Sequence, residues 1–284
     1  MSWKSLKKRC TIELIRFKLL PRFNKSFLSR IFHISRISLY RLSSKRSSQD
    51  EILKDQILAV LDQNPSYGHR RIALDLKVGK KRIRRVMKKF GMKPYKRKAR
   101  WRKRRDERRL SAPYQNLIKG SCPIIPGAVL VGDFTYIQYQ EKIFYLATFM
   151  DLFTREIVGW SISHRHTKEL IIEALLDVIK TLDHLPRIVH TDQGSEYTSK
   201  EYTGFLTSLG IQISMSKKSS PWENGYQESY YNNFKTDLGL EFDRFPSLGE
   251  FILGIHQTIN YYNKIRIQTS LKMSPEQFKK LKSG

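Results

Sequence analysis

The sequence predicts an α/β protein in which a mixed five-stranded sheet, flanked by helices, follows all-α helix-turn-helix units. Three observations lead to this prediction. Residues 1–120 hold 36 Lys and Arg against 8 Asp and Glu, whereas residues 121–284 hold 17 against 18. Apolar residues in the first part recur at helical spacing. From Gly127 onwards, short apolar runs typical of strands are interspersed with amphipathic helical segments.

Residues 1–49 are expected to form an N-terminal helical segment. Within it, residues 33–42 combine a turn with a helix that presents Arg36 and Arg41. Two short helices joined by a tight turn are typical of a helix-turn-helix, whose second helix enters the major groove of DNA. A plain helical hairpin fits this segment equally well, so both interpretations stay open.

Residues 50–95 are predicted to be a helix-turn-helix DNA-binding domain, joined to the first segment by a polar linker, residues 43–49. The first helix has an apolar stripe made of Ile52, Ile57, Val60 and Leu61. A later helix, residues 80–90, has an almost wholly cationic outer face. Such a face repels itself unless it contacts phosphates, so we expect DNA contacts from Lys81, Arg82, Arg84 and Arg85.

Residues 96–126 are interpreted as a basic linker. It begins with a cluster that is too charged to fold alone and is expected to follow a phosphate backbone: Lys96, Arg97, Lys98, Arg100, Arg102, Lys103, Arg104 and Arg105. Neutralising about six phosphates would give a log-log salt slope of roughly −5. The alternative is a solvated basic face. Because the charge is confined to one part of the chain, a nucleic-acid-binding part is favoured.

Residues 127–284 carry the predicted sheet and its helices. Three strands joined by tight turns give an antiparallel meander, and two later strands alternate with helices, which makes a sheet of mixed direction. The expected strands are residues 128–139, 142–152, 155–164, 187–191 and 211–215. The expected helices are residues 167–182, 199–209, 223–238 and 245–263, the last with Pro246 in its first turn.

Three acidic residues are candidates for a catalytic site. Asp133 lies inside an apolar strand, where a charge is costly unless it is paired or bound to a metal. Asp192 follows the strand at residues 187–191, at the sheet edge where ligands collect. Glu228 lies in a helix that can pack across this edge. We therefore expect the three carboxylates to converge.

Clustered carboxylates repel one another and take up protons unless divalent cations hold them. Oxygen ligands suit Mg²⁺ or Mn²⁺, and two such ions support in-line phosphoryl transfer. The spacing alone is weak evidence. Taken singly, Asp133 also fits a strand-edge carboxylate, Asp192 a turn former and Glu228 a solvated helix residue.

Four stretches in chain order strengthen the metal interpretation: Val131–Tyr136, Asp151–Trp160, His190–Ser199 and Ser220–Ser229. Together they resemble the integrase core of bacterial insertion-sequence transposases of the OrfB type, Asp-Asp-Glu enzymes related to retroviral integrases. The resemblance implies an RNase H-like fold for residues 127–284. It assigns catalysis and the binding of two Mg²⁺ ions, replaceable by Mn²⁺, to Asp133, Asp192 and Glu228.

The resemblance extends beyond the four stretches. Residues 67–72 and 81–85 resemble the helix-turn-helix of the family, which adds Arg70 and Arg71 to the expected DNA contacts. Residues 262–275 resemble its closing motif. The likeness thus runs from about residue 50 to about residue 278.

Individual positions near the expected site follow or depart from the family pattern. Lys235, two helical turns beyond the glutamate, is implied to contact transposon-end DNA near the scissile phosphate. Gln268 stands where many relatives carry His, and Glu196 where many carry Gln. Trp222 and Tyr226 either stack on bases or pack against the helix start.

The resemblance implies a DNA transposase that binds terminal inverted repeats, nicks the 3′ ends and joins them to new DNA. Its expected partners are double-stranded DNA of the transposon ends and target, and further copies of itself in a homodimer or larger assembly. Because the first 49 residues match loosely, the chain fits either a whole transposase or the catalytic product of a two-frame element, which has an upstream reading-frame product as partner. The alternative is a non-catalytic DNA-binding regulator with an inert core.

Composition limits the cellular setting. Two cysteines, Cys10 and Cys122, exclude a disulfide scaffold and a cysteine-rich zinc finger. No segment approaches the roughly 20 apolar residues of a membrane span, and charged residues interrupt any secretory signal. We therefore expect a cytoplasmic, nucleoid-associated bacterial protein without a membrane partner.

Overall fold

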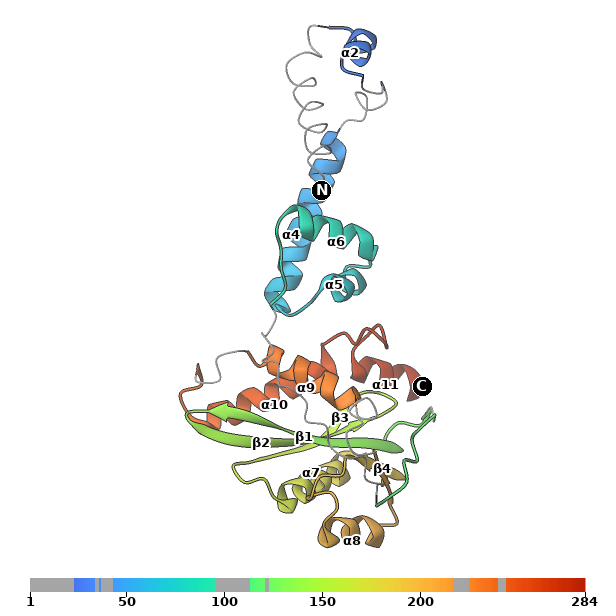
Figure 1. The fold of residues 1–284 in the computed structure, drawn as a ribbon, viewed down its shortest axis with the longest axis vertical. Coiled ribbons are helices and arrows are strands. Elements are labelled where there is room, and N and C mark those ends of the chain that lie inside the picture. The colour runs from blue at the N-terminus through green and yellow to red at the C-terminus, as the bar shows by residue number, and fades with distance from the viewer. Residues whose placement is uncertain are drawn as a thin grey trace. The chain divides into compact units, whose positions relative to one another are not determined.

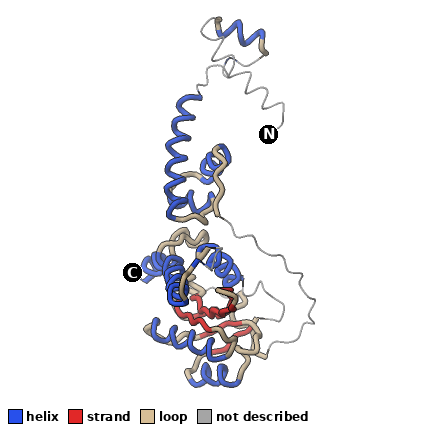
Figure 2. The backbone as a smooth tube through the Cα atoms, turned by 90° about the vertical axis from the view of Figure 1, so that its left-hand side faces the viewer, coloured by secondary structure: helices blue, strands red, loops and turns tan. Residues whose placement is uncertain are grey.

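The computed structural model describes residues 23–33, 36, 43–95, 113–120, 123–216, 225–239 and 244–283. Figures 1 and 2 show the course of the backbone. The chain divides into two compact units, Met1–Ala59 with Arg82–Met92, and Val60–Lys81 with Lys93–Gly284. The domain boundaries expected at residues 49, 95 and 126 stay predictions.

Two helices come first in the described part of the chain. α2 (Lys25–Ile31) begins after Asn24, whose side chain accepts a hydrogen bond from the backbone N–H of Ser26. α4 (Ser43–Gln63) includes residues 43–49, so the prediction of a polar linker there is wrong. That stretch contains no glycine or proline, and its polarity alone does not stop a helix.

The buried face of α4 differs from the predicted stripe at one position. Leu53, Ile57 and Val60 are buried, three and four residues apart, whereas Ile52 is 61% exposed. Each residue turns the helix by about 100°, so Ile52 falls outside the face that Leu53 shares with Ile57.

α5 (His69–Asp75) and α6 (Lys80–Lys89) follow, close to their predicted bounds. The apolar side chains of α6 are buried, as expected: Ile83, Val86 and Met87. Its cationic face is exposed, as expected: Lys81, Arg82, Arg84, Arg85 and Lys88. Of the helices that the structure describes, none is both long enough and apolar enough to span a bilayer.

The described residues form the predicted mixed sheet of five strands, with the order β3-β2-β1-β4-β5. The strands are β1 (Val129–Tyr139), β2 (Lys142–Asp151), β3 (Ile157–Ser163), β4 (Ile188–Thr191) and β5 (Gln212–Met215). β1, β2 and β3 are antiparallel, while β4 is parallel to both β1 and β5. The central strand β1 therefore borders both the antiparallel and the parallel part.

Helices cover both faces of this sheet (Figure 1): α7 (Lys168–Thr181), α8 (Lys200–Ser208), α9 (Gly225–Asp237) and α10 (Leu248–Lys264). α7 and α8 share a buried core with Leu130 and Phe149 of the sheet. α9 and α10 share the opposite core with Ile137 and Leu146. Side chains at even positions of β1 thus pack in one core and those at odd positions in the other, because successive side chains of a strand point to opposite faces.

The start of α10 differs from the prediction. The Ser247 hydroxyl accepts a hydrogen bond from the backbone N–H of Glu250 (3.2 Å) and caps the helix. Pro246 therefore precedes the helix and does not lie in its first turn.

A last helix, α11 (Pro275–Ser283), was not predicted. The backbone N–H of Ser274 donates to Gln277 Oε1 (3.3 Å), and that of Gln277 donates to Ser274 Oγ (3.4 Å). This reciprocal pair is a capping box, and Pro275 suits the first helical position. Both are sequence signals from which α11 could have been found.

Candidate active site

Asp133 and Asp192 belong to neighbouring parallel strands. The pairing of β1 with β4 runs as far as Val131↔His190. Continued by two residues, the same register brings Asp133 level with Asp192, directly after β4 ends at Thr191. Level residues of adjacent strands project to the same face. Two of the three candidate acids therefore meet at the carboxyl edge of β4, where ligands collect in such sheets.

The environment of Asp133 disfavours its negative charge. Burial raises the pKa of this carboxyl to about 8, and the charges of Asp192 and Glu228 act in the same direction. A hydrogen bond from the backbone N–H of Phe134 to Oδ1 (2.8 Å) opposes them. At neutral pH this carboxyl therefore binds a proton unless a cation balances its charge.

Asp192 opens a tight loop. Its Oδ1 accepts the backbone N–H of Gly194 (2.9 Å). A Cβ at Gly194 would lie 3.1 Å from both Asp192 Oδ1 and Glu196 Oε2, so a residue without a side chain suits this position. Burial raises the pKa of Asp192, the Gly194 hydrogen bond lowers it, and the charge of Glu196 raises it again.

Glu196 forms a buried polar pair beside this loop that the sequence analysis missed. Its side chain is 8% exposed. Oε1 lies 3.0 Å from His166 Nδ1 and accepts the Ser195 hydroxyl (2.9 Å). The only signal for this pair in the sequence is that Glu196 stands where many relatives carry glutamine.

Glu228 is exposed in the first turn of α9. Its charge acts on Asp133, as the raised pKa of that residue shows. Within the described ranges, however, no group of three or more His, Cys, Asp or Glu side chains could hold a metal ion. The structure thus brings Asp133 and Asp192 together without closing the three acids into one cage.

Two buried side chains of α9 contact the sheet beside Asp133. The Gln227 side-chain amide donates to the backbone carbonyl of Val131 (2.5 Å), and the Tyr231 hydroxyl donates to that of Asp133 (2.5 Å). The sequence analysis missed both residues. Their spacing of four marks one helix face, but nothing local in the sequence identifies the strand carbonyls they reach.

Lys235 is 8% exposed, and its Nζ lies 4.7 Å from the ring centroid of Tyr136. Its contact with DNA stays a prediction. At the start of α9, the guanidinium carbon of Arg155 lies 3.6 Å from the ring centroid of Tyr226. Tyr226 therefore packs against a cation at the helix start, whereas Trp222 lies outside the described residues.

The two arginines of residues 67–72 differ in their surroundings. Arg70 is exposed, whereas Arg71 Nε donates to the backbone carbonyl of Ile267 (2.9 Å). Burial, followed by the nearby charge of Arg266, lowers the pKa of Arg71 to about 10. Part of its hydrogen-bonding capacity is therefore used within the protein.

Arg85 is the one expected DNA contact of α6 that forms an ion pair in the described residues. Its two terminal nitrogens donate to the two oxygens of Asp50 (2.7 and 2.5 Å) and hold the pKa of Asp50 at about 2. The expected contacts of the basic linker lie outside the described residues: Lys96, Arg97, Lys98, Arg100, Arg102, Lys103, Arg104 and Arg105.

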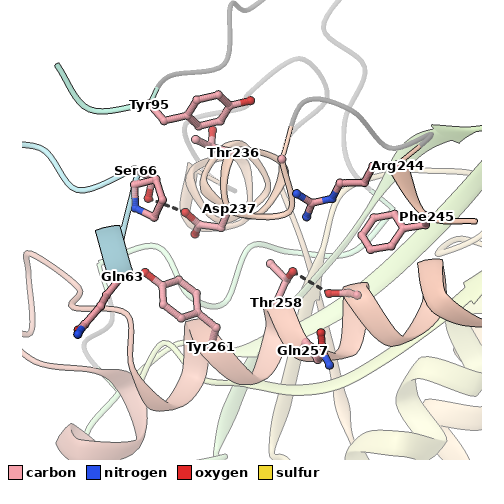
Figure 3. Close-up of a pocket in the computed structure, with 13 residues that line it drawn as sticks. Gln63, Ser66, Tyr95, Thr236, Asp237, Arg244, Phe245, Gln257, Thr258 and Tyr261 are labelled. Carbon is pink, nitrogen blue, oxygen red and sulfur yellow. Dashed lines mark hydrogen bonds between the residues drawn. The ribbon is translucent and has the colours of Figure 1, made fainter. Parts of the chain in front are cut away.

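A cavity of about 580 Å³ is lined by none of the three acids. Figure 3 shows its lining, to which α9, α10 and residues 63–66 contribute. Ser66 Oγ donates to Asp237 Oδ1 (2.6 Å) there. Asp237 Oδ2 also pairs with Nε of the buried Arg266 (2.5 Å). These contacts hold the end of α9 and are separate from the candidate site.

Known proteins match this chain over most of its length. The integrase core domain family matches residues 124–221, and a second family of the same description matches residues 209–275. The transposase for insertion sequence element IS904 of Lactococcus lactis is 34% identical over 259 residues, which are 86% of this chain and 100% of that protein. The chain belongs to the insertion-sequence transposases.

Further similarities agree with this assignment. A 31 kDa protein of insertion element IS600 from Shigella sonnei is 30% identical to this transposase over 266 residues, 89% of this chain and 97% of that protein. A chain of the simian T-cell lymphotropic virus intasome, solved with the PP2A regulatory subunit B56 gamma, aligns with a TM-score of 0.51 at 20% identity, over 78% of this chain and 73% of that one. The transposase core thus has the predicted RNase H-like fold. Its relatives do not favour the alternative of a non-catalytic regulator.

Proposed function

We propose that this transposase binds the terminal inverted repeats of its element, nicks the 3′ ends and joins them to new DNA. Asp133, Asp192 and Glu228 would hold two Mg²⁺ ions, or Mn²⁺ in their place. The observation that carries this proposal is the pair of level carboxyls on β1 and at the end of β4, one with a pKa of about 8. Membership of the transposase family supports it.

The residues present fit a divalent cation. Carboxylate oxygens are hard ligands of the kind that Mg²⁺ and Mn²⁺ prefer. Burial, with the charges of Asp192 and Glu228 acting in the same direction, raises the pKa of Asp133, and a bound cation would release the proton from this carboxyl. When bound, two divalent ions activate the attacking oxygen and stabilise the leaving oxygen of a phosphoryl transfer.

Each acid would contribute in a different way. Asp133 is held by its strand and Asp192 by the hydrogen bond from Gly194, so these two give carboxylates in set positions. Glu228 is exposed on α9 and would supply its oxygens through a flexible side chain. Bound cations would offset the repulsion among the three carboxylates.

We infer that the helix-turn-helix at residues 50–95 and the basic linker at residues 96–126 bind the backbone of double-stranded DNA. The strongest described candidates are the exposed cations of the helical part, Arg70, Lys81, Arg82 and Arg84. Arg71 and Arg85 are partly engaged by Ile267 and Asp50. Lys235 and the exposed Tyr136 would contact the transposon end near the scissile phosphate.

Joining requires that two DNA ends meet, so we expect a homodimer or larger assembly on DNA. The partners would be the transposon ends, the target and, for a two-frame element, an upstream reading-frame product. The expected location is the bacterial nucleoid. Sedimentation of the protein with saturating end DNA tests the assembly, and a monomeric complex would contradict it.

The catalytic proposal is tested with a labelled duplex that carries one end of the element. We expect Mg²⁺-dependent nicking and strand transfer, both abolished by Asp192→Asn. Asp183→Asn is the matched control, because Asp183 is also an aspartate but is exposed on a loop. Cleavage that survives Asp192→Asn would reject the proposal. A regulator would bind this DNA equally well with and without Mg²⁺ and would never cut it.

A further inference from the structure

The hydroxyl of Tyr231 joins α9 to the backbone of a candidate catalytic residue. It donates to the carbonyl of Asp133 (2.5 Å) and lies 2.8 Å from the hydroxyl of Thr148. Thr148 is the cross-strand partner of Asp133 in the β1–β2 ladder and is 1% exposed. A residue of α9 therefore reaches both strands at the level of Asp133.

Gln227 makes the corresponding contacts one helical turn earlier. Its amide nitrogen donates to the carbonyls of Val131 (2.5 Å) and Thr148 (3.3 Å). Its Oε1 accepts the hydroxyl of Thr148 (3.3 Å). Gln227 has no exposed surface, so water does not compete for these hydrogen bonds. The two side chains fix both the rotation of α9 and its position along β1.

Glu228 directly follows Gln227 and precedes Tyr231 by three residues. It therefore lies beside the face of α9 that contacts the sheet. The hydrogen bonds of Gln227 and Tyr231 to the sheet determine the position of the Glu228 backbone. We propose that Gln227 and Tyr231 are positioning residues that set the distance between Glu228 and Asp133. This inference rests on the proposed function, because it assumes that the two carboxylates act together.

Tyr230 provides an internal comparison. It lies on the same helix and is 1% exposed, but its buried hydroxyl has no hydrogen-bond partner within the described structure. Tyr230 thus contributes its ring to the core shared by α9, α10 and the sheet. Removal of its hydroxyl should leave the position of α9 unchanged, whereas removal of the Tyr231 hydroxyl breaks the link to Asp133.

The test compares Tyr231→Phe with the matched control Tyr230→Phe in the full-length protein. Single-turnover nicking of labelled end DNA is measured against Mg²⁺ concentration, together with affinity for the same DNA and the melting temperature. For Tyr231→Phe we expect a rate lower by about tenfold and a raised Mg²⁺ half-saturation, because small misplacements of catalytic groups are costly. End-DNA affinity should stay within about twofold, as expected for residues that contact no phosphate.

Gln227→Met is a second variant of similar length and should show the same pattern. Equal nicking rates and equal Mg²⁺ half-saturation for the two tyrosine variants would overturn the inference. So would a Tyr231→Phe defect that appears equally in DNA affinity and melting temperature, since that defect would be structural. Failure of the proposed function is distinguishable, because Asp192→Asn would then cut as fast as the wild type, or the wild type itself would not cut, whatever the tyrosine variants do.

Discussion

Replacing Asp133 with Asn should stabilise the metal-free transposase at alkaline pH and remove its response to Mg²⁺. Burial and neighbouring acids raise the pKa of this carboxyl from 3.8 to about 8. Between these values the folded protein holds a proton that the unfolded chain has released. The stability of the wild-type protein therefore falls as pH rises from about 4 to about 8, and asparagine removes this dependence.

The magnitude follows from the same two pKa values. Each pH unit between them corresponds to about 1.4 kcal/mol, which gives an upper limit near 6 kcal/mol at pH 8. The side chain is only partly buried, so solvent screens part of this penalty. We therefore expect Asp133→Asn to raise the free energy of unfolding by about 2 kcal/mol at pH 8 and by almost nothing at pH 4.

The assay is thermal unfolding in EDTA and in Mg²⁺, followed by circular dichroism between pH 4 and pH 8.5. Mg²⁺ should raise the melting temperature of the wild-type protein but not that of the variant, because a cation stabilises only the folded state that binds it. Asp183→Asn, at an exposed position, should behave like the wild type. A variant no more stable than the wild type at pH 8 in EDTA, or one that responds fully to Mg²⁺, would refute the reasoning.

Two further predictions concern the end of α9 and the basic face of α6. Asp237→Asn should cost about 3 kcal/mol because it leaves the buried Arg266 without its ion-pair partner, whereas Glu201→Gln, in the exposed pair with Lys168, should cost less than about 1 kcal/mol in chemical denaturation. Equal costs would contradict this difference. Alanine at three exposed cations should reduce the log-log salt slope of DNA binding by about 3, measured by fluorescence anisotropy: Lys81, Arg82 and Arg84. Lys180→Ala, on α7, is the control, and an unchanged slope for the triple variant would exclude α6 from the DNA interface.

The spacing of apolar residues predicted those strands and helices whose ends depend on residues close together in the sequence. The strand at residues 128–139 and the helix at residues 167–182 were placed within one residue of the observed ends, because their apolar periods differ clearly. The face of α4 was harder to predict, since apolar residues occupy both position 52 and position 53. Helical spacing distinguishes the two, because Leu53, Ile57 and Val60 lie four and three residues apart on one face, whereas Ile52 lies five residues from Ile57.

In the candidate site, too, some features could be predicted from the sequence, whereas others depend on contacts between residues far apart in the chain. Their places in the predicted strands and helix singled out the three acids as candidates, and the family resemblance strengthened this prediction. The strand register explains why Asp133 and Asp192 become level. The hydrogen bond between Tyr231 and Asp133 joins residues 98 positions apart, so no local pattern could reveal it. Three carboxylates repel one another, so under our proposal their approach would depend on bound cations, which no sequence pattern describes.

The contacts of α9 limit how the three acids can meet. Gln227 and Tyr231 attach its first half to β1 and β2, Phe234 is fully buried in the core, and Asp237 is paired with Arg266 at its end. A helix held at three levels does not shift as a body without breaking several buried contacts. We therefore expect a cation to draw in the exposed side chain of Glu228 by rotamer change, while the backbone of α9 stays where the sheet holds it.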